Sequence, residues 1–172
     1  MAPSKAVDLS ATAVSQGTSF VFSFLNGHLN AKDTSYTENL SVTITNPGNV
    51  DAVVTINSPY PLFSNLTVTV GSGQSKTVPI NPADMQTDYM DQYLQKAVVE
   101  NKTLFVNSNV PVSLIGSNSL TGGGGEDKFV VLPICQLGQE YHVVGDESSH
   151  NFASYQSTNI ITVIAVQDNT NV

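Results

Sequence analysis

The sequence predicts an all-β protein: an antiparallel β-sandwich of the immunoglobulin-like type, the opening strands of a second, truncated β repeat, and one short helix. Three observations predict it. The 172 residues include 22 Val and 16 Thr, and β-branched side chains suit a pleated, half-buried surface. Apolar and polar residues alternate over many short runs, which is the period of a strand. Clusters of Gly, Pro, Asn and Asp separate these runs, as turns do.

The first run, residues 18–25 (TSFVFSFL), shows this alternation most clearly. It places three phenylalanines on one face: Phe20, Phe22 and Phe24. Asn26 and Gly27 follow, and both residue types tolerate the positive φ of a tight turn. We therefore expect a strand with an aromatic inner face.

The next runs predict a series of hairpins. Residues 40–45 and 52–57 alternate in the same way, and the turn 46–49 (NPGN) between them predicts an antiparallel pair. Residues 63–70 form another strand, with three apolar side chains inward: Leu66, Val68 and Val70. A short strand at 75–80 follows.

Residues 81–96 break the alternation. Asn81 can cap a helix, Pro82 suits its first position, and Asp84 falls in the first turn. Met85, Tyr89 and Tyr93 recur every four residues, which predicts one amphipathic helix of about three turns over an open end of the sandwich.

The rest of the chain predicts five more strands. Their ranges are 98–106, 110–116, 129–134, 140–144 and 159–166. The turn 107–109 (NSN) would join the first two. Residues 121–126 contain four consecutive glycines, which lose much entropy on ordering, so we expect a linker or a mobile loop there.

A weak internal sequence repeat predicts the domain organisation. Residues 17–22 align with 138–143, and residues 39–44 align with 159–164 at nearly the same spacing. A period this long indicates tandem domains. We therefore expect a β-sandwich at 17–120 and the start of a second repeat at 126–172.

The charge balance excludes some partners. The chain has 14 acidic residues against 6 Lys and no Arg, a net charge of −8, so we expect no nucleic acid partner. No apolar run reaches the roughly 18 residues of a membrane span. A polar, weakly charged surface is typical of secreted proteins, and we expect an extracellular location.

No constellation predicts catalysis, and we expect neither an enzyme nor a cofactor. His142, Asp146 and His150 are spaced for one helix face, but they lie in a predicted strand and loop, so they need not converge on a metal. Ser148 and Ser149 lack a nucleophile-elbow turn. The acidic residues, including Glu126 and Asp127, show no calcium-loop spacing.

Four further positions are candidates for modification or binding. Asn39, Asn65 and Asn101 begin glycosylation sequons, and Asn65 belongs to an outward face. Tyr60 lies between two prolines and is a candidate binding anchor. The single cysteine, Cys135, is either a buried thiol or pairs with a residue outside this sequence.

Several blocks resemble the IgGFc-binding protein N-terminal domain family. They are 17–25 (GTSFVFSFL), 40–56, 74–80 (QSKTVPI), 100–118, 127–144 and 161–171, and their order carries the resemblance. It implies a secreted, non-enzymatic adhesion module of mucus or extracellular matrix. Its ligand does not carry over, because no ligand-reading motif of that family maps onto this chain.

The sequence therefore favours an extracellular recognition module that binds protein or glycoprotein partners. The alternative is a structural protein that self-associates through exposed edge strands. A third hypothesis, a metal-dependent enzyme or calcium-stabilised domain, would need the histidine cluster or the loop at Glu126.

Overall fold

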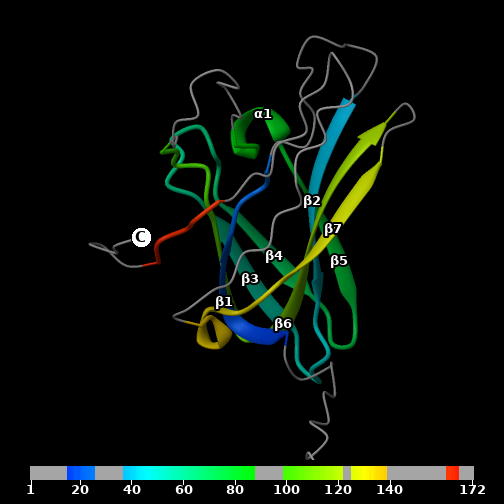
Figure 1. The fold of residues 1–172 in the computed structure, drawn as a ribbon. Coiled ribbons are helices and arrows are strands. Elements are labelled where there is room, and N and C mark those ends of the chain that lie inside the picture. Colours follow the sequence, from blue (N-terminus) through cyan, green and yellow to red (C-terminus); the bar gives the residue numbers. More distant parts are fainter. Residues whose placement is uncertain (1–14, 26–36, 88–98, 122–124, 139–161, 167–172) are drawn as a thin grey trace, which may run out of the picture.

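A computed structural model describes residues 15–25, 37–87, 99–121, 125–138 and 162–166 (Figure 1). These residues form one antiparallel sheet and two short helical turns. The strands are β1 (Gln16–Phe22), β2 (Thr37–Thr45), β3 (Ala52–Asn57), β4 (Leu66–Val70), β5 (Ser75–Ile80), β6 (Leu104–Thr121) and β7 (Glu126–Val131). The helical turns are α1 (Pro82–Met85) and the 3-10 turn η1 (Ile134–Gln136). The predicted antiparallel β class is confirmed.

All seven strands belong to one sheet, with the order β4-β3-β6-β2-β5 and with β1 and β7 also paired to β6. The sheet curls around its core as a half-barrel (Figure 1). The predicted separation into two sandwich layers is therefore not confirmed. The reason is β6, whose 18 residues are long enough to pair with four other strands.

The first half of β6 lies between β1 and β3, and its second half lies between β7 and β2. The predicted turn at 107–109 is wrong, because the chain continues through it as one strand. The turn-forming residues instead mark a bulge. Gly17 pairs with Val112 while Ser19 pairs with Asn107, so four residues of β6, 108–111, lie opposite Thr18 alone.

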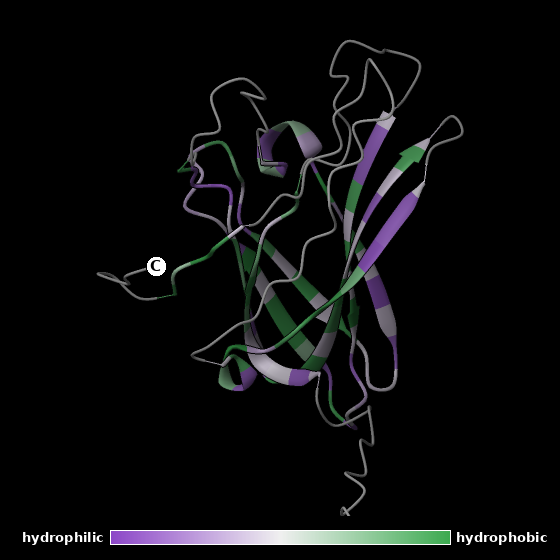
Figure 2. Ribbon diagram, in the orientation of Figure 1, coloured by the Kyte–Doolittle hydropathy of each residue, from purple (hydrophilic) through white to green (hydrophobic). Residues whose placement is uncertain are grey.

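The core lies on the concave side of the curled sheet. Alternate residues of β2, β3 and β6 are buried in it, and Figure 2 shows hydrophobic and hydrophilic bands along the strands. Its fully buried large side chains include Phe20, Phe24, Leu40, Ile44, Ile56, Met85, Leu104 and Leu114. Burial of each stabilises the fold by about 1.5–3 kcal/mol. The predicted inner faces of the runs 18–25, 40–45 and 63–70 are confirmed.

Three aromatic rings pack against one another in one part of this core. Phe22, Phe24 and Phe129 meet edge to face, with ring centroids 5.6–6.1 Å apart. Phe129 on β7 is paired with Gly116 on β6. A Cβ atom at Gly116 would lie 2.4 Å from the ring of Phe129, so glycine is required for the ring to lie there.

The predicted three-turn helix is wrong. Asn81 caps α1 as expected, its Oδ1 accepting the N–H of Ala83 at 3.2 Å. The helix nevertheless ends at Met85, and Gln86 is extended, with ψ 132°. The N–H of Thr87 then donates to the carbonyl of Phe24 at 2.9 Å. Pairing with the end of the aromatic strand therefore replaces the helix. Tyr89 and Tyr93 lie outside the described residues.

The C-terminal predictions meet the structure only in part. The predicted strand 129–134 begins earlier, at Glu126, and ends at Val131. Thr162–Val166, predicted as strand, is described without strand pairing. The described residues include none of the predicted strand 140–144 and only the first residue of the repeat segment 138–143. The glycine run connects two strands that pair with each other, and the division into domains 17–120 and 126–172 stays a prediction.

Candidate recognition groove

A buried asparagine organises one end of the sheet. Asn46 directly follows β2, and it is fully buried. Its Nδ2 lies within hydrogen-bond distance of three carbonyl oxygens: Val50 at 2.8 Å, Val70 at 3.0 Å and Gly71 at 3.2 Å. Its Oδ1 accepts the N–H of Gly48 at 3.0 Å. One side chain therefore fixes the β2–β3 turn and the β4–β5 turn to each other.

A second set of contacts supports the same turn. The hydroxyl of Ser72 donates to the carbonyl of Gly48 at 2.9 Å, and the N–H of Ser72 donates to Asp51 Oδ1 at 3.1 Å. The backbone N–H of Asn46 donates to the carbonyl of Gln74 at 2.9 Å. Because these bonds tie the turn down from both sides, it is a rigid platform.

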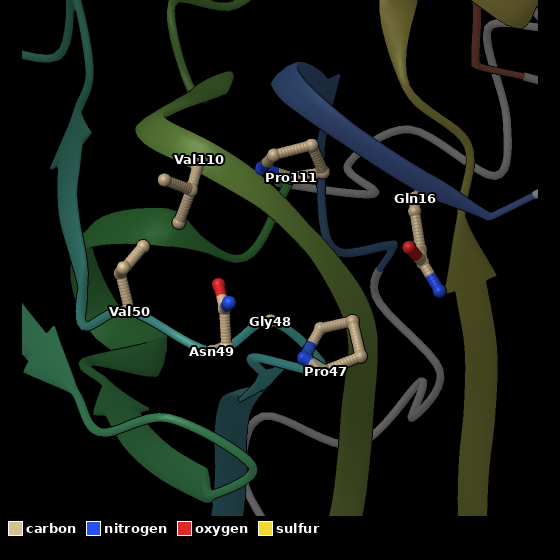
Figure 3. A pocket seen from close by; sticks show the side chains of 7 residues that line it. All are labelled: Gln16, Pro47, Gly48, Asn49, Val50, Val110 and Pro111. Carbon is tan, nitrogen blue, oxygen red and sulfur yellow. The ribbon is translucent and has the colours of Figure 1, made fainter.

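This platform forms one wall of a shallow groove of about 300 Å³. The lining residues come from the turn, from the bulge of β6 and from the start of β1: Pro47, Gly48, Asn49, Val50, Val110, Pro111 and Gln16. Figure 3 shows Val50 and Val110 pointing toward one another across it. The bulge is what brings Val110 and Pro111 to this wall.

The chemistry of the groove is apolar and uncharged. None of its seven lining residues is ionisable, although the chain carries a net charge of −8. Val50 is 53% exposed, so its side chain is available to a partner. The exposed amide of Asn49 supplies a donor and an acceptor. The groove can therefore take an uncharged side chain or a short extended segment.

A second polar cluster, around Lys102, is buried, and its charged group is already bonded within the protein. Lys102 is 8% exposed, and its Nζ donates to the carbonyl of Gln86 at 2.9 Å and lies 3.6 Å from Glu100 Oε1. It also stands 5.8 Å from the centre of the Tyr60 ring. These contacts join the residues before β6 to the end of α1, so the cluster stabilises the fold.

Tyr60, the predicted binding anchor, is half-buried and packs against the core beneath Lys102. It does not line the groove. Its ring already has partners on two sides, so a role in recognition stays a prediction.

The three sequon asparagines lie in different surroundings. Asn39 is in β2, and its Nδ2 donates to Thr121 Oγ1 at 2.8 Å and to the carbonyl of Thr37 at 3.2 Å. Asn65 is exposed immediately before β4, and Asn101 is exposed just before the buried Lys102. All three asparagines are thus exposed, although the amide of Asn39 is hydrogen-bonded, and their glycosylation stays a prediction.

The remaining predicted residues add no site. Cys135 is free and exposed in η1, so its thiol is not buried. His142, Asp146, Ser148, Ser149 and His150 lie outside the described residues. Within the described ranges, no three His, Cys, Asp or Glu side chains are grouped as a metal site would need, and no helix has the length and apolar character of a membrane span.

Glu126, at the outer end of the β6–β7 pair, has a carboxylate with a shifted pKa. Lys128 Nζ lies 2.9 Å from Glu126 Oε1, and the hydroxyl of Ser117 donates to the same oxygen at 3.1 Å. These hydrogen bonds, the one from Lys128 first, hold the pKa of Glu126 below its ordinary value. Glu126 is exposed, and this contact is a surface pair outside the groove.

The sequence pattern does not predict the groove. It indicates a turn at 46–49 and places Pro111 inside a predicted strand. Their meeting depends on the register of β6 against β1, which no local pattern reports. The available signal was the proline within an apolar run, because proline inside a strand marks an edge or a bulge.

Comparisons with known proteins add little. No protein-family model matches the chain, and no curated protein matches it at a significant level. The crystal structure of Thermotoga maritima 1070 is similar over 66% of this chain and 91% of that chain, with a TM-score of 0.37 and 15% identity. A likeness this low carries no argument about function.

Proposed function

We propose that this chain is an extracellular, non-enzymatic recognition module that binds a protein or glycoprotein partner in the groove between the β2–β3 turn and the β6 bulge. The observation that carries the proposal is the combination of a rigid wall, tied down by Asn46, with an exposed apolar lining at Val50. Recognition loops on rigid β scaffolds use this arrangement. The partner would present an uncharged segment.

The resemblance to the IgGFc-binding protein N-terminal domain family supports the proposal, since it implies a secreted adhesion module. The immunoglobulin-like sandwich belongs to the same proposal. Its two layers would share β6: one layer of β4, β3, β6 and β1, and one of β5, β2, β6 and β7. The register of β6, with different neighbours along its two halves, supports this description.

The test uses a charge placed in the groove. The purified chain is assayed for binding to immobilised mucins, matrix glycoproteins and immunoglobulin Fc. Val50→Asp puts a carboxylate in the uncharged groove, and we expect it to weaken binding by about tenfold or more, that is about 1.4 kcal/mol. Val53→Asp is the matched control, because Val53 is also an exposed valine, 43% exposed on β3, but lies outside the groove.

Two results would count against recognition through the groove. One is the absence of any partner at micromolar concentration. The other is equal loss of binding in the two variants, since that would place the partner elsewhere or show an effect of net charge alone.

A second candidate function is structural assembly through exposed edge strands. The observation that favours it is an outer strand, β4, that contains neither a charged residue nor a proline. Light scattering at high concentration tests it, and a strict monomer would contradict it.

A further inference from the structure

Four strands of the described sheet have an edge that faces away from the sheet, and the chain protects three of them. Natural proteins protect edges with charges, prolines or a covering segment, because an open edge recruits other strands. β5 carries Lys76 and Pro79, and β7 carries Glu126, Asp127 and Lys128. β1 is covered, since Phe20 pairs with Pro133 and η1 packs beside it.

β4 has none of these protections in the part of the chain that the structure describes. Its five residues, LTVTV, are strand formers, and residues 64–72 contain no charge and no proline. It is the last strand of the sheet order and pairs with β3 alone among the described strands. An uncharged edge of this kind is suited to accept a further strand.

The core is also incompletely covered on this side. Leu66 and Val68 of β4 point inward but are only partly buried. Tyr60 and Phe63 from the preceding loop also pack against the core and are also only partly buried. The inner residues of β3, such as Val54 and Ile56, are fully buried. A strand added beyond β4 would cover the half-buried apolar side chains.

The chain contains a segment with the properties of such a strand. Residues 162–166 (TVIAV) are apolar and β-branched, with no charge, proline or glycine. The structure describes them without strand pairing, with Val163 59% and Val166 44% exposed. An exposed, uncharged segment of high strand propensity is prone to pair with another strand.

We propose that residues 162–166 of one copy add as a strand to the β4 edge of a second copy. This deepens the second candidate function and does not depend on the groove. A second copy is the occupant because, among the described residues, neither the segment nor the β4 edge has a strand partner on its open side within one copy. Neither contributes a charge, so pairing brings no like charges together although each copy carries −8. Donation between copies either closes as a reciprocal dimer or continues as an open series.

The test changes the donor and the acceptor separately, in the full chain. Val163→Glu places a charge in the donor segment, and Val99→Glu is its matched control at a valine that is 95% exposed. Val68→Lys places an inward-pointing charge on the edge strand. Sedimentation or light scattering over a concentration series measures association, and circular dichroism checks that each variant is folded.

We expect the unmodified chain and Val99→Glu to associate reversibly. Val163→Glu and Val68→Lys should each weaken association by about tenfold or more, that is about 1.4 kcal/mol. Mixing the two weakened variants should restore a complex of two copies and no more, since one supplies an intact edge and the other an intact donor. If Val68→Lys does not fold, the comparison of Val163→Glu with Val99→Glu still tests whether residues 162–166 donate the added strand.

Three results would overturn the proposal. The first is a strictly monomeric unmodified chain, which would also be the result if each segment occupied its own edge. The second is association that Val163→Glu does not weaken more than Val99→Glu. The third is a mixture of the two folded variants that stays monomeric. The groove variant Val50→Asp should leave association unchanged, so recognition and assembly can fail separately.

Discussion

At the residue scale, two positions in this fold allow almost no substitution, for opposite reasons. Asn46 is a polar side chain that the core requires, because backbone carbonyls surround it. At Gly116 the core has no room for a side chain, because the Phe129 ring occupies the space. Neither requirement follows from hydrophobicity, and both follow from the distances between neighbouring elements.

Asn46→Ala should destabilise the fold by about 2–4 kcal/mol, because buried acceptors left without a donor each cost about 1–3 kcal/mol. Asn46→Asp should cost at least as much, since a carboxylate would face the carbonyls of Val50 and Val70. Urea unfolding measures both. Asn49→Asp in the same turn is exposed and should change stability by less than about 0.5 kcal/mol. Equal effects at Asn46 and Asn49 would disprove the anchoring role.

Gly116→Ala should cost about 1–3 kcal/mol, because the new methyl group displaces the Phe129 ring from Phe22 and Phe24. Gly125→Ala is the control: nothing lies within 4 Å of its Cβ position, so it should be neutral or slightly stabilising. Thermal unfolding compares the two. Combining Gly116→Ala with Phe129→Leu should recover part of the loss, and strict additivity would contradict the proposed clash.

At the scale of elements, β6 decides the architecture. Apolar alternation correctly identified the strands near 40–45, 52–57 and 75–80, since each has one buried face. It failed at 107–109, where polar residues suggested a turn but form a bulge. It failed again after Met85, because pairing of Thr87 with Phe24 replaced a helix that local spacing favoured. Long-range pairing outweighed local propensity in both places.

The outer end of the β6–β7 pair should be weakened by acid. Because the pKa of Glu126 is lowered in the folded chain, its contact with Lys128 stabilises the fold above the ordinary pKa of a glutamate. This stabilisation is lost as the pH falls through the lowered folded value. The difference in unfolding free energy between the unmodified chain and Glu126→Gln should thus be largest near neutral pH and vanish in acid.

Titration by nuclear magnetic resonance gives the independent check of that contact. Lys128→Met should raise the pKa of Glu126 toward its ordinary value, since Lys128 makes the largest contribution to the lowering. An unchanged titration of Glu126 in Lys128→Met would show that the contact is not formed in solution.

At the scale of the whole molecule, the chain is acidic and its groove is neutral. A net charge of −8 with no Arg generates repulsion across the surface, which opposes the compact state. The proposed recognition in an uncharged groove would avoid repulsion between this surface and an acidic partner.

Added salt should therefore stabilise the folded chain. We expect the melting temperature at neutral pH to rise by about 2–5 °C between about 10 and 150 mM sodium chloride, over which the screening length falls from about 30 to 8 Å. The control is the same pair of measurements near pH 4.5, the isoelectric point, where the effect should nearly disappear. A fall in melting temperature with salt at neutral pH would mean that attractive ion pairs dominate.

Local sequence patterns are enough to predict the strand class, the inner faces of the early strands and the capped start of α1, because these depend on alternation and on residues adjacent in the chain. Three features become evident only in the folded chain: one 18-residue strand holds the sheet together, Pro47 and Pro111 line the same groove, and β4 is the unprotected edge among the described strands. These depend on the register between strands far apart in the chain. Register is set by the packing of the whole core, and no local pattern encodes it.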